Sequence, residues 1–362
     1  MMERDIYLKV VEELESCYAP VPNRSTFYRA IKEMLTPEDC ELWLRFPKHS
    51  EKAVTLDEME HDDIYNNCIQ HLFDTAFLIE WNQENGVPHY VRSYIFQIML
   101  SHSLPSDTSL LQDATRDWFN EIREGMSGRF EFESPEYRVI PHEGALTGDK
   151  EFGEFSLDME IPDTRQVVTY DYVSEMVNSQ ELIIVGPCFC RSNKDVLQER
   201  ECDHPIETCI LFGKMAERNL KYGWGRKITA EDALEIVRKS RERGLVQCIS
   251  NAKEPSILCN CCECCCISLA SMSRHEFVAG KPSRYIASLK EDRCAGCGKC
   301  ADVCPMHTYE IKDEKAVYDP NKCIGCGLCV TRCKQGALSL VLRKDADERY
   351  LPDRERLEVM FL

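Results

Sequence analysis

Apolar residues in the first part of the chain recur mainly at helical spacing. Thr36, Pro37 and Asp39 form a helix start, because threonine caps free backbone N–H groups and proline suits the first helical position. A second start of this kind lies at Thr55, and apolar residues then follow at helical intervals: Ile64, Cys68, Leu72, Phe73 and Ala76. The pattern predicts three consecutive helices, the second of them short.

A β-hairpin signal follows these helices. Residues 77–81 and 90–95 are rich in aromatic and aliphatic side chains, and between them lies Asn85-Gly86, a pair typical of two-residue hairpin turns. With three helices before the hairpin, residues 30–100 resemble a winged-helix fold. Residues 36–100 hold four basic side chains against twelve acidic ones, so this surface should repel the phosphates of a DNA duplex. We interpret the segment as a protein-docking module, with a DNA reader as the alternative.

Strand and helix patterns alternate in the second half of the chain. Residues 182–185 are an apolar run that ends at Gly186-Pro187, which predicts a buried strand. Thr229 begins a helix that runs through Arg243, and residues 245–250 form a further predicted strand. Between these elements, Cys209 is predicted to lie in a helix that begins at Pro205 or Ile206.

Charge and composition narrow the range of functions. The chain has 44 lysines and arginines against 62 aspartates and glutamates, a formal net charge of −18. This excess of acid argues against nucleic acid as a partner. No stretch approaches the roughly 18 consecutive apolar residues that a membrane span needs, and the charged start lacks the apolar region of a secretory signal. We therefore expect a cytoplasmic protein without a membrane span.

The cysteines divide the chain chemically. Nineteen of the 22 lie between Cys188 and Cys333. Without an export signal we do not expect disulfides, so these thiols are predicted to be metal ligands or catalytic groups.

Two quartets near the C-terminus share the spacing C-x2-C-x2-C-x3-C. Three thiolates from one tight loop can hold three corners of a [4Fe–4S] cluster, and the fourth cysteine is predicted to open a helix that crosses to the other cluster. The first cluster is assigned to Cys294, Cys297, Cys300 and Cys333. The second cluster is assigned to Cys323, Cys326, Cys329 and Cys304. Residues 309–311 and 316–318, between the loops, are predicted strands.

Residues 290–342 resemble the bacterial two-cluster ferredoxin module, in DRCAGCGKCADVCPMH and NKCIGCGLCVTRCKQG. Lys334 departs from that family, which usually has proline after the fourth cysteine. That proline shapes the turn and does not bind iron, so the assignment of ligands is unaffected. Two zinc sites are the alternative interpretation, because paired C-x2-C motifs also suit tetrahedral zinc.

Two further groups of cysteines lie in the centre of the chain. The first group consists of Cys188, Cys190, Cys202 and Cys209. The second group consists of Cys259, Cys261, Cys262, Cys264, Cys265 and Cys266. The first predicts a third [4Fe–4S] cluster, with zinc or unligated thiols as alternatives. The second is denser than one cluster requires, so it holds one metal centre and lends ligands to the first group, or holds two. Cys248 is left over.

The whole arrangement resembles a family of anaerobe iron–sulfur proteins that join a winged-helix-like segment, a C-x-C-R segment, a C-x-C-C-x-C-C-C run and a two-cluster ferredoxin module. The matching residues are CFCR at 188–191, DHPIETC at 203–209, GRKITAEDAL at 225–234, GLVQ at 244–247 and CNCCECCC at 259–266. The resemblance implies electron transfer and no particular substrate.

These observations predict an α+β multidomain fold. Its expected parts are a winged-helix-like domain at 1–104, a connector at 105–175 with a helix at 110–124 and loops at 101–109 and 141–153, a Cys-rich α/β domain at 176–280, a two-cluster ferredoxin domain at 281–345 and a charged tail at 346–362.

Three functions are compatible with this sequence. The first is an electron-transfer protein, or the electron-transfer subunit of an anaerobic oxidoreductase complex, with two C-terminal [4Fe–4S] clusters and one or two central metal centres. Its redox partners would be a ferredoxin, a flavoprotein or an oxidoreductase subunit. The second is an enzyme whose central cluster binds substrate, which leaves catalytic residues unassigned. The third is a redox-sensing regulator. The first is favoured because the chain has no nucleophile elbow, P-loop, zincin or dinucleotide-binding motif.

Overall fold

The computed structural model describes residues 5–17, 24–48, 51–93, 137–147, 171–196, 198–221, 223–274, 280–344 and 346. The chain divides into two compact units. An N-terminal unit comprises Met1–Glu131, Ser192–Glu199 and Val359–Leu362, and a core unit comprises Phe132–Arg191 and Arg200–Glu358. The described helices include none with the length and apolar character that a membrane crossing requires.

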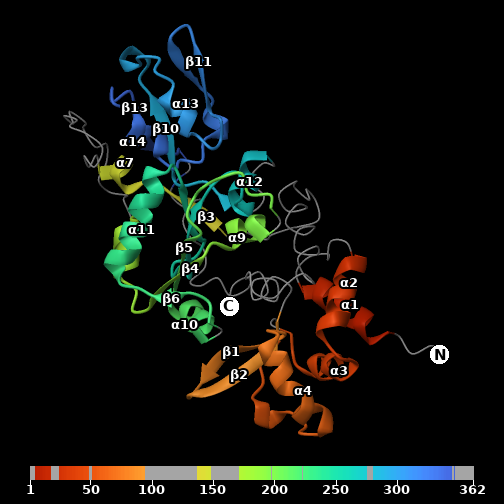
Figure 1. The fold of residues 1–362 in the computed structure, drawn as a ribbon. Helices are drawn as coiled ribbons and strands as arrows, with labels where there is room; N and C mark the ends of the chain where they lie inside the picture. Colours follow the sequence, from red (N-terminus) through yellow and green to blue (C-terminus); the bar gives the residue numbers. More distant parts are fainter. Residues whose placement is uncertain are drawn as a thin grey trace. The chain divides into compact units, whose positions relative to one another are not determined.

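The N-terminal unit consists of helices followed by a hairpin, drawn in red and orange in Figure 1. Its elements are α1 (Ile6–Cys17), α2 (Arg24–Met34), α3 (Pro37–Arg45), the 3-10 turn η1 (Leu56–Glu58), α4 (Asp63–Asp74), β1 (Leu78–Glu84) and β2 (Val87–Arg92). Thr36 caps α3 through a reciprocal pair of hydrogen bonds with Asp39, as the sequence predicts. The short helix predicted after Thr55 is only a single 3-10 turn.

The predicted hairpin is confirmed. Strands β1 and β2 pair antiparallel around Asn85 and Gly86, whose φ angles of 53° and 80° are both positive, as this type of two-residue turn demands. Val54 adds a single bridge to Tyr90 on β2. Trp43 of α3 is buried and donates from its indole nitrogen to the Phe77 carbonyl, which fixes the helices against the hairpin. The winged-helix assignment and the docking role of this unit stay predictions.

The core unit is built on a seven-stranded sheet with the order β6-β4-β5-β8-β7-β3-β9. Neighbouring strands pair antiparallel, except that β3 and β9 are parallel. The strands are β3 (Tyr137–Ile140), β4 (Ile183–Pro187), β5 (Glu207–Phe212), β6 (Arg226–Lys227), β7 (Val246–Ser250), β8 (Ile257–Cys261) and β9 (Gly280–Lys281). The associated helices are α7 (Glu143–Thr147), α8 (Val173–Asn178), α10 (Gly213–Lys221), α11 (Ala230–Glu242) and α12 (Ile267–Arg274). Helix α9 (Phe189–Val196) begins in the core unit, and its residues from Ser192 on belong to the N-terminal unit.

The two faces of this sheet differ in chemistry because side chains alternate along each strand. One face packs Ile210, Ile249 and Leu258 against α8 and α11 in an apolar core without cysteine. The opposite face carries cysteines and packs against α12, whose Leu269 and Met272 are buried there. Figure 1 shows α11 and α12 on opposite sides of the strands.

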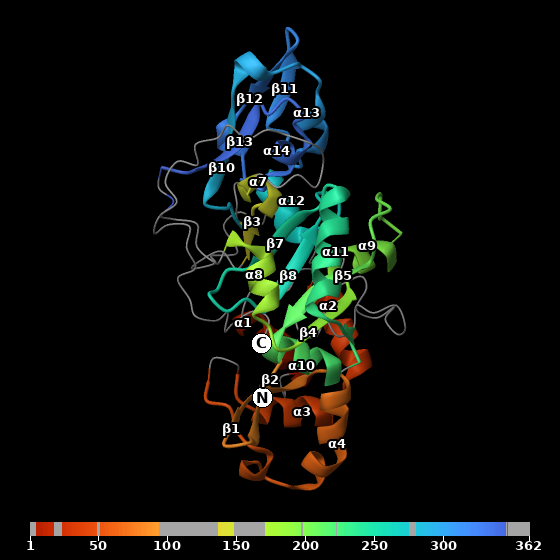
Figure 2. The same ribbon diagram turned by 90° about the vertical axis from the view of Figure 1, so that its left-hand side faces the viewer.

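A smaller α/β segment completes the core unit and is drawn in blue in Figure 2. Strand β10 (Tyr285–Leu289) pairs with β13 (Leu338–Leu342), and β11 (Tyr309–Lys312) pairs with β12 (Lys315–Tyr318). Between them lie the 3-10 turns η4 (Glu291–Arg293) and η5 (Pro320–Lys322) and the short helices α13 (Lys299–Val303) and α14 (Leu328–Arg332). The strands predicted at 309–311 and 316–318 are confirmed.

The structure corrects two expectations about secondary structure. Cys209 lies in strand β5 and not in a helix, because Thr208 to Phe212 is a β-branched and apolar run that is buried between β4 and β8. Residues 137–147, predicted as connector and loop, contribute strand β3 and helix α7 to the core unit. The predicted helix at 110–124, the loop at 101–109 and nearly all of the charged tail lie outside the described residues.

The predicted strand at 182–185, the helix that begins after Thr229 and the strand at 245–250 are confirmed as β4, α11 and β7. Thr229 caps α11 by the same reciprocal bonding as Thr36, and Gly244 follows the helix with a positive φ of 78°.

Candidate metal centres

The two C-terminal cysteine loops have the same local structure. In each, the first cysteine follows a 3-10 turn, the third lies in a short helix and the fourth caps the C-terminal end of that helix. The prediction that the fourth cysteine opens a helix is therefore wrong. Each short helix contains the third cysteine and the three residues that follow it, so the helix lies before the fourth cysteine.

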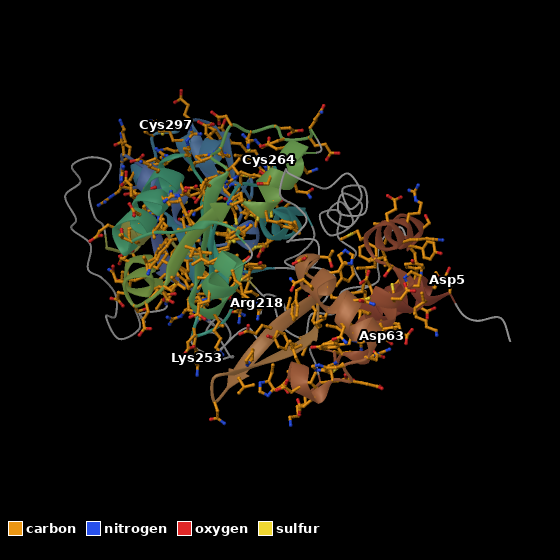
Figure 3. The ribbon with its side chains drawn as sticks, turned by 60° about the horizontal axis from the view of Figure 1, so that its bottom comes forward. Asp5, Asp63, Arg218, Lys253, Cys264 and Cys297 are labelled. Carbon is orange, nitrogen blue, oxygen red and sulfur yellow. The ribbon has the colours of Figure 1, made fainter. Side chains whose placement is uncertain are left out.

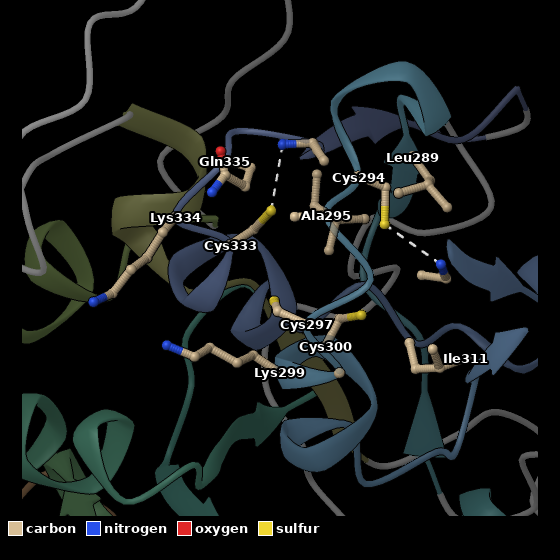
Figure 4. Close-up of a pocket in the computed structure, with 14 residues that line it drawn as sticks. Leu289, Cys294, Ala295, Cys297, Lys299, Cys300, Ile311, Cys333, Lys334 and Gln335 are labelled. Carbon is tan, nitrogen blue, oxygen red and sulfur yellow. Dashed lines mark hydrogen bonds between the residues drawn. The ribbon is translucent and has the colours of Figure 1, made fainter. Parts of the chain in front are cut away.

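The loops gather the eight thiols into two sets of four. One pocket, shown in Figure 4, is lined by three cysteines of the first loop and the last of the second: Cys294, Cys297, Cys300 and Cys333. The other pocket is lined by the complementary four: Cys304, Cys323, Cys326 and Cys329. Each set therefore takes three thiols from one loop and one from the other; that each set binds one cluster stays a prediction.

Backbone N–H groups point at several of these sulfurs. The Ala316 N–H donates to Cys294 Sγ at 3.4 Å, the Ala337 N–H to Cys333 Sγ at 3.3 Å, and the Gly325 N–H to Cys323 Sγ at 3.4 Å. Two of these contacts are the dashed lines of Figure 4. Such donors favour the thiolate form that iron requires and lower the electron density on the cluster. The donor set and its surroundings therefore fit [4Fe–4S] clusters.

Residues 293–337 match the family model of the 4Fe-4S dicluster domain. The curated relatives agree with this match. Ferredoxin-2 of Desulfomicrobium norvegicum is 48% identical over 33 residues, which are 9% of this chain and 56% of the relative. Ferredoxin-3 of Desulfocurvibacter africanus is also 48% identical over 33 residues, 9% of this chain and 54% of the relative. The chain spans about half the length of the curated relatives it matches, and no solved structure gives a significant match.

The dicluster domain gives the chain iron–sulfur electron-transfer capacity. Its two sites differ in exposure. Cys297 of the first site is exposed and is marked in Figure 3, whereas Cys329 of the second site is buried. The Tyr309 hydroxyl donates to Cys329 Sγ at 3.3 Å, and burial raises the pKa of the Cys329 thiol to about 12. The first site therefore faces solvent and the second faces the protein interior.

Three central cysteines lie in a row across the sheet. Cys248 on β7 is directly opposite Cys259 on β8, and the register of β5 against β8 places Cys209 beside Cys259 on the other side. All three belong to the face that packs against α12. Cys261 lies on the same face as Cys259 because it is two residues further along β8. Strand pairing thus unites thiols from three separated segments, which we call the sheet thiols.

Thiols from two further positions join this row. Cys190, just after β4, and Cys266, just before α12, interact with each other, and Cys266 also interacts with Cys261. The Cys266 thiol, together with burial, raises the pKa of Cys190 well above its ordinary value. Burial, with smaller contributions from Cys190 and Cys262, raises the pKa of Cys188 to about 12. Without metal these thiols are therefore protonated at neutral pH, so a metal that binds here must displace protons.

The remaining four central cysteines form a separate group. The thiols of Cys202, Cys262, Cys264 and Cys265 all lie within 4.8 Å of one another. Cys202 comes from the segment before β5, and the other three come from the turn between β8 and α12. We call this group the compact quartet; Cys264, labelled in Figure 3, is one of its two partly exposed members.

This arrangement divides the ten predicted central ligands differently from the sequence grouping. Cys202 does not gather with Cys188, Cys190 and Cys209 but joins the second sequence group. Those three thiols instead lie near Cys259, Cys261 and Cys266. The reason is that β5 carries Cys209 into the sheet, while Cys202 stays in the preceding loop.

A buried arginine lies between the two thiol groups. The Arg191 side chain is completely buried, and its guanidinium donates to the carbonyls of Pro205 and Asn260 and to Thr208 Oγ1 at 2.7 Å. It also hydrogen-bonds the Cys262 thiol and faces Cys188. Hydrogen bonds from Cys264, Cys265 and Arg191 hold the pKa of Cys262 well below its usual range. The arginine therefore supplies a fixed positive charge for anionic sulfur.

The dicluster domain shares one apolar core with the sheet thiols. This shared core contains buried residues of both regions: Val139, Val246, Cys248, Cys261, Cys266, Leu269, Met272, Met306, Ile324 and Leu328. Cys304 and Cys326 of the second cluster site pack against it. The His142 N–H donates to the Cys326 carbonyl at 2.7 Å, and the Ser283 N–H donates to the Ile324 carbonyl at 3.0 Å. The second cluster site is thus joined to the sheet by direct packing and hydrogen bonds.

Sequence reasoning missed two features of this region. Cys248 belongs to neither sequence group, but its position on β7 opposite Cys259 places it among the sheet thiols. The buried ion cluster of Asp171 with Arg284, at 2.9 Å, and Arg138, at 3.9 Å, gave no sequence signal. These ion pairs join β3 and the residue before β10 to Asp171, which lies in the segment predicted as a connector. They help to hold the dicluster domain against the sheet.

Proposed function

We propose that the chain is an iron–sulfur electron-transfer protein, or the electron-transfer subunit of an oxidoreductase complex, that passes single electrons between the dicluster domain and a central metal centre at the sheet thiols. Cys294, Cys297, Cys300 and Cys333 hold the first cluster. Cys323, Cys326, Cys329 and Cys304 hold the second. Clusters bound there supply reversible one-electron chemistry, and the chain's own residues set the order of the sites, their exposure and their surroundings.

The observation that carries this proposal is the shared core. Cys304 and Cys326 pack against the same buried cluster of side chains as Cys248, Cys261 and Cys266, so no solvent layer separates the second cluster site from the sheet thiols. The two cluster sites also share a core, to which Cys294, Cys300, Cys304, Cys323, Cys329 and Cys333 all contribute. Apolar packing of this kind keeps the surroundings of each centre rigid and dry, which limits the reorganisation that follows a change of charge.

The difference in exposure indicates which site exchanges electrons with a partner and which sites lie further inside the protein. The first cluster site has the exposed Cys297, and the second has buried Cys329 and Leu328 around it. The first site is therefore the point at which a soluble redox partner exchanges electrons with the chain. The sheet thiols pack against α12 and the dicluster domain, and Cys248 and Cys261 are buried there. The proposed route for electrons from the first site to these thiols runs through the second cluster.

Partner proteins, and not nucleic acid, are the proposed ligands of the N-terminal unit. Its excess of acidic residues opposes contact with phosphates. Retention of the full-length protein on duplex DNA at low salt would contradict this part of the proposal.

The experiment compares the metal-reconstituted full-length protein with Cys326→Ser and a control, Cys68→Ser, which changes a buried thiol of the N-terminal unit. Electrons are delivered by a photoreductant, and the reduction of each centre is followed by EPR after rapid freezing. In the wild type and the control we expect the central centre to be reduced after the dicluster domain. In Cys326→Ser the central centre should be reduced much more slowly. Equal rates in all three proteins would refute the electron path.

A further inference from the structure

The spacing of the sulfurs in the compact quartet is unusually short for a cluster site. Cys202 Sγ lies 3.8 Å from Cys265 Sγ, and Cys264 Sγ lies 3.6 Å from Cys265 Sγ. A disulfide needs about 2.05 Å, so these contacts are not bonds between sulfurs. Four thiolates at about 2.3 Å from one tetrahedral ion lie about 3.8 Å apart, because the edge of a tetrahedron is about 1.6 times its centre-to-corner distance. The two measured spacings fit that edge.

The dicluster domain provides an internal comparison. In a [4Fe–4S] cluster each thiolate binds a different iron, so the four sulfurs are spread over the corners of a larger body. Within the described residues, the compact quartet is the one group of three or more cysteine, histidine or carboxylate ligands that lie within 4.8 Å of one another. The thiols of the two dicluster quartets, all of which are described, are therefore further apart.

The surroundings of the compact quartet favour a half-buried site whose negative charge is partly compensated. Leu245 is buried against it, and Cys262 and Cys265 are themselves buried. One divalent ion with four thiolates has a net charge of −2, and the buried guanidinium of Arg191 hydrogen-bonds Cys262. The Arg200 side chain donates to the Cys202 carbonyl at 2.8 Å, which orients the loop that supplies the distant ligand.

We propose that Cys202, Cys262, Cys264 and Cys265 bind a single tetrahedral thiophilic ion, zinc or iron, without inorganic sulfide. The ion ties the loop before β5 to the turn between β8 and α12, whose ligands are 63 residues apart in the case of Cys202 and Cys265. This inference goes beyond the proposed function and does not depend on it, because the ion lies outside the electron path through the sheet thiols.

The test uses the full-length protein, purified without oxygen, and counts zinc, iron and acid-labile sulfide per chain. Cys202→Ser and Cys264→Ser change the two partly exposed ligands, and Cys68→Ser is again the matched control. Each ligand variant should lose one metal ion and no sulfide, whereas the control should lose neither. Loss of zinc identifies the ion as zinc, and loss of one iron without sulfide identifies a single iron; both support the site.

Two results would overturn the assignment. One is a parallel loss of about four irons and four sulfides, which indicates a [4Fe–4S] cluster. The other is an unchanged metal content in both ligand variants. If a variant does not fold, X-ray absorption of the wild type decides. A spectrum that shows a metal with about four sulfurs at about 2.3 Å and no second metal nearby supports the site. A protein without zinc in which every iron has another iron nearby contradicts the site. Failure of the electron path would leave these counts unaltered.

Discussion

Two glycines of the dicluster domain offer a matched pair of substitutions. Both Gly325 and Gly298 have left-handed backbone, with φ of +69° and +79°. A methyl group on Gly325 would lie 2.0 Å from the Tyr285 carbonyl oxygen and 2.2 Å from Ser283 Oγ, whereas one on Gly298 would meet nothing within 4 Å. Gly325→Ala and Gly298→Ala therefore share the backbone penalty and differ only in the close approach.

The magnitudes follow from this difference. Left-handed backbone costs a residue with a side chain about 1–2 kcal/mol, and this applies to both variants. In Gly325→Ala the β10 backbone must also move away, at about 1–3 kcal/mol for an overpacked site. The movement disturbs the 2.8 Å bond from Ser283 Oγ to the Gly325 carbonyl, worth about 0.5–1.5 kcal/mol. We expect Gly325→Ala to destabilise the domain by about 2–4 kcal/mol more than Gly298→Ala does.

The assay is anaerobic unfolding in urea, followed by the absorbance of the iron–sulfur clusters and by sulfide release. Gly325→Ala should lose the second cluster at a clearly lower urea concentration than Gly298→Ala, which should fall below the wild type only by the backbone penalty. If the two variants lose their clusters together, the contact with β10 does not constrain the second loop and the reasoning is refuted.

Three further predictions concern charge and protonation. Arg191→Met should reduce the metal bound by the central cysteines, because the substitution leaves buried anionic sulfur without a compensating charge. The dicluster domain should keep about eight irons. Arg191→Lys keeps the charge and should retain more metal, and equal metal content in the two variants would argue against charge compensation. Burial opposes ionisation of Asp39, but hydrogen bonds from Thr36 and His71 outweigh it and hold the pKa of Asp39 below its ordinary value. The stabilisation is therefore present above the unfolded pKa and lost as the pH falls through the lower folded pKa. Asp39→Ala should speed amide hydrogen exchange in α3 at pH 7 by a factor that matches about 1 kcal/mol, and this factor should shrink as the pH falls through the folded pKa; a factor that does not change with pH would contradict this. Burial is the main cause that raises the pKa of Cys188, which lies near the sheet thiol Cys259, to about 12. Metal binding at the sheet thiols together with Cys188 should therefore release protons and tighten from about pH 6 to about pH 8. An unbuffered titration without proton release would show that the thiols were already ionised.

Local sequence was sufficient for the dicluster domain. The eight predicted ligands lie within two short loops, so their spacing alone predicts which three thiols of a loop line one pocket and which one lines the other. The same holds for the capped helices at Thr36 and Thr229 and for the hairpin at Asn85-Gly86, where the signal is contained in a few neighbouring residues. In each case the chemistry depends on contacts that the chain makes with its immediate neighbours.

The grouping of the central cysteines could not be predicted in this way. Cys209, Cys248 and Cys259 are brought together by the pairing of β5, β8 and β7, and Cys202 is separated from Cys209 because one lies in a loop and the other in a strand. Cysteine spacing alone does not predict strand order, because the pairing of a strand depends on burial of its whole apolar face. The sequence by itself determined that the chain is rich in thiols with the spacing of metal ligands and that its C-terminal part holds a dicluster domain. Only the tertiary structure decided how the central cysteines divide between the sheet thiols and the compact quartet, because strand pairing brings together segments that are far apart along the chain.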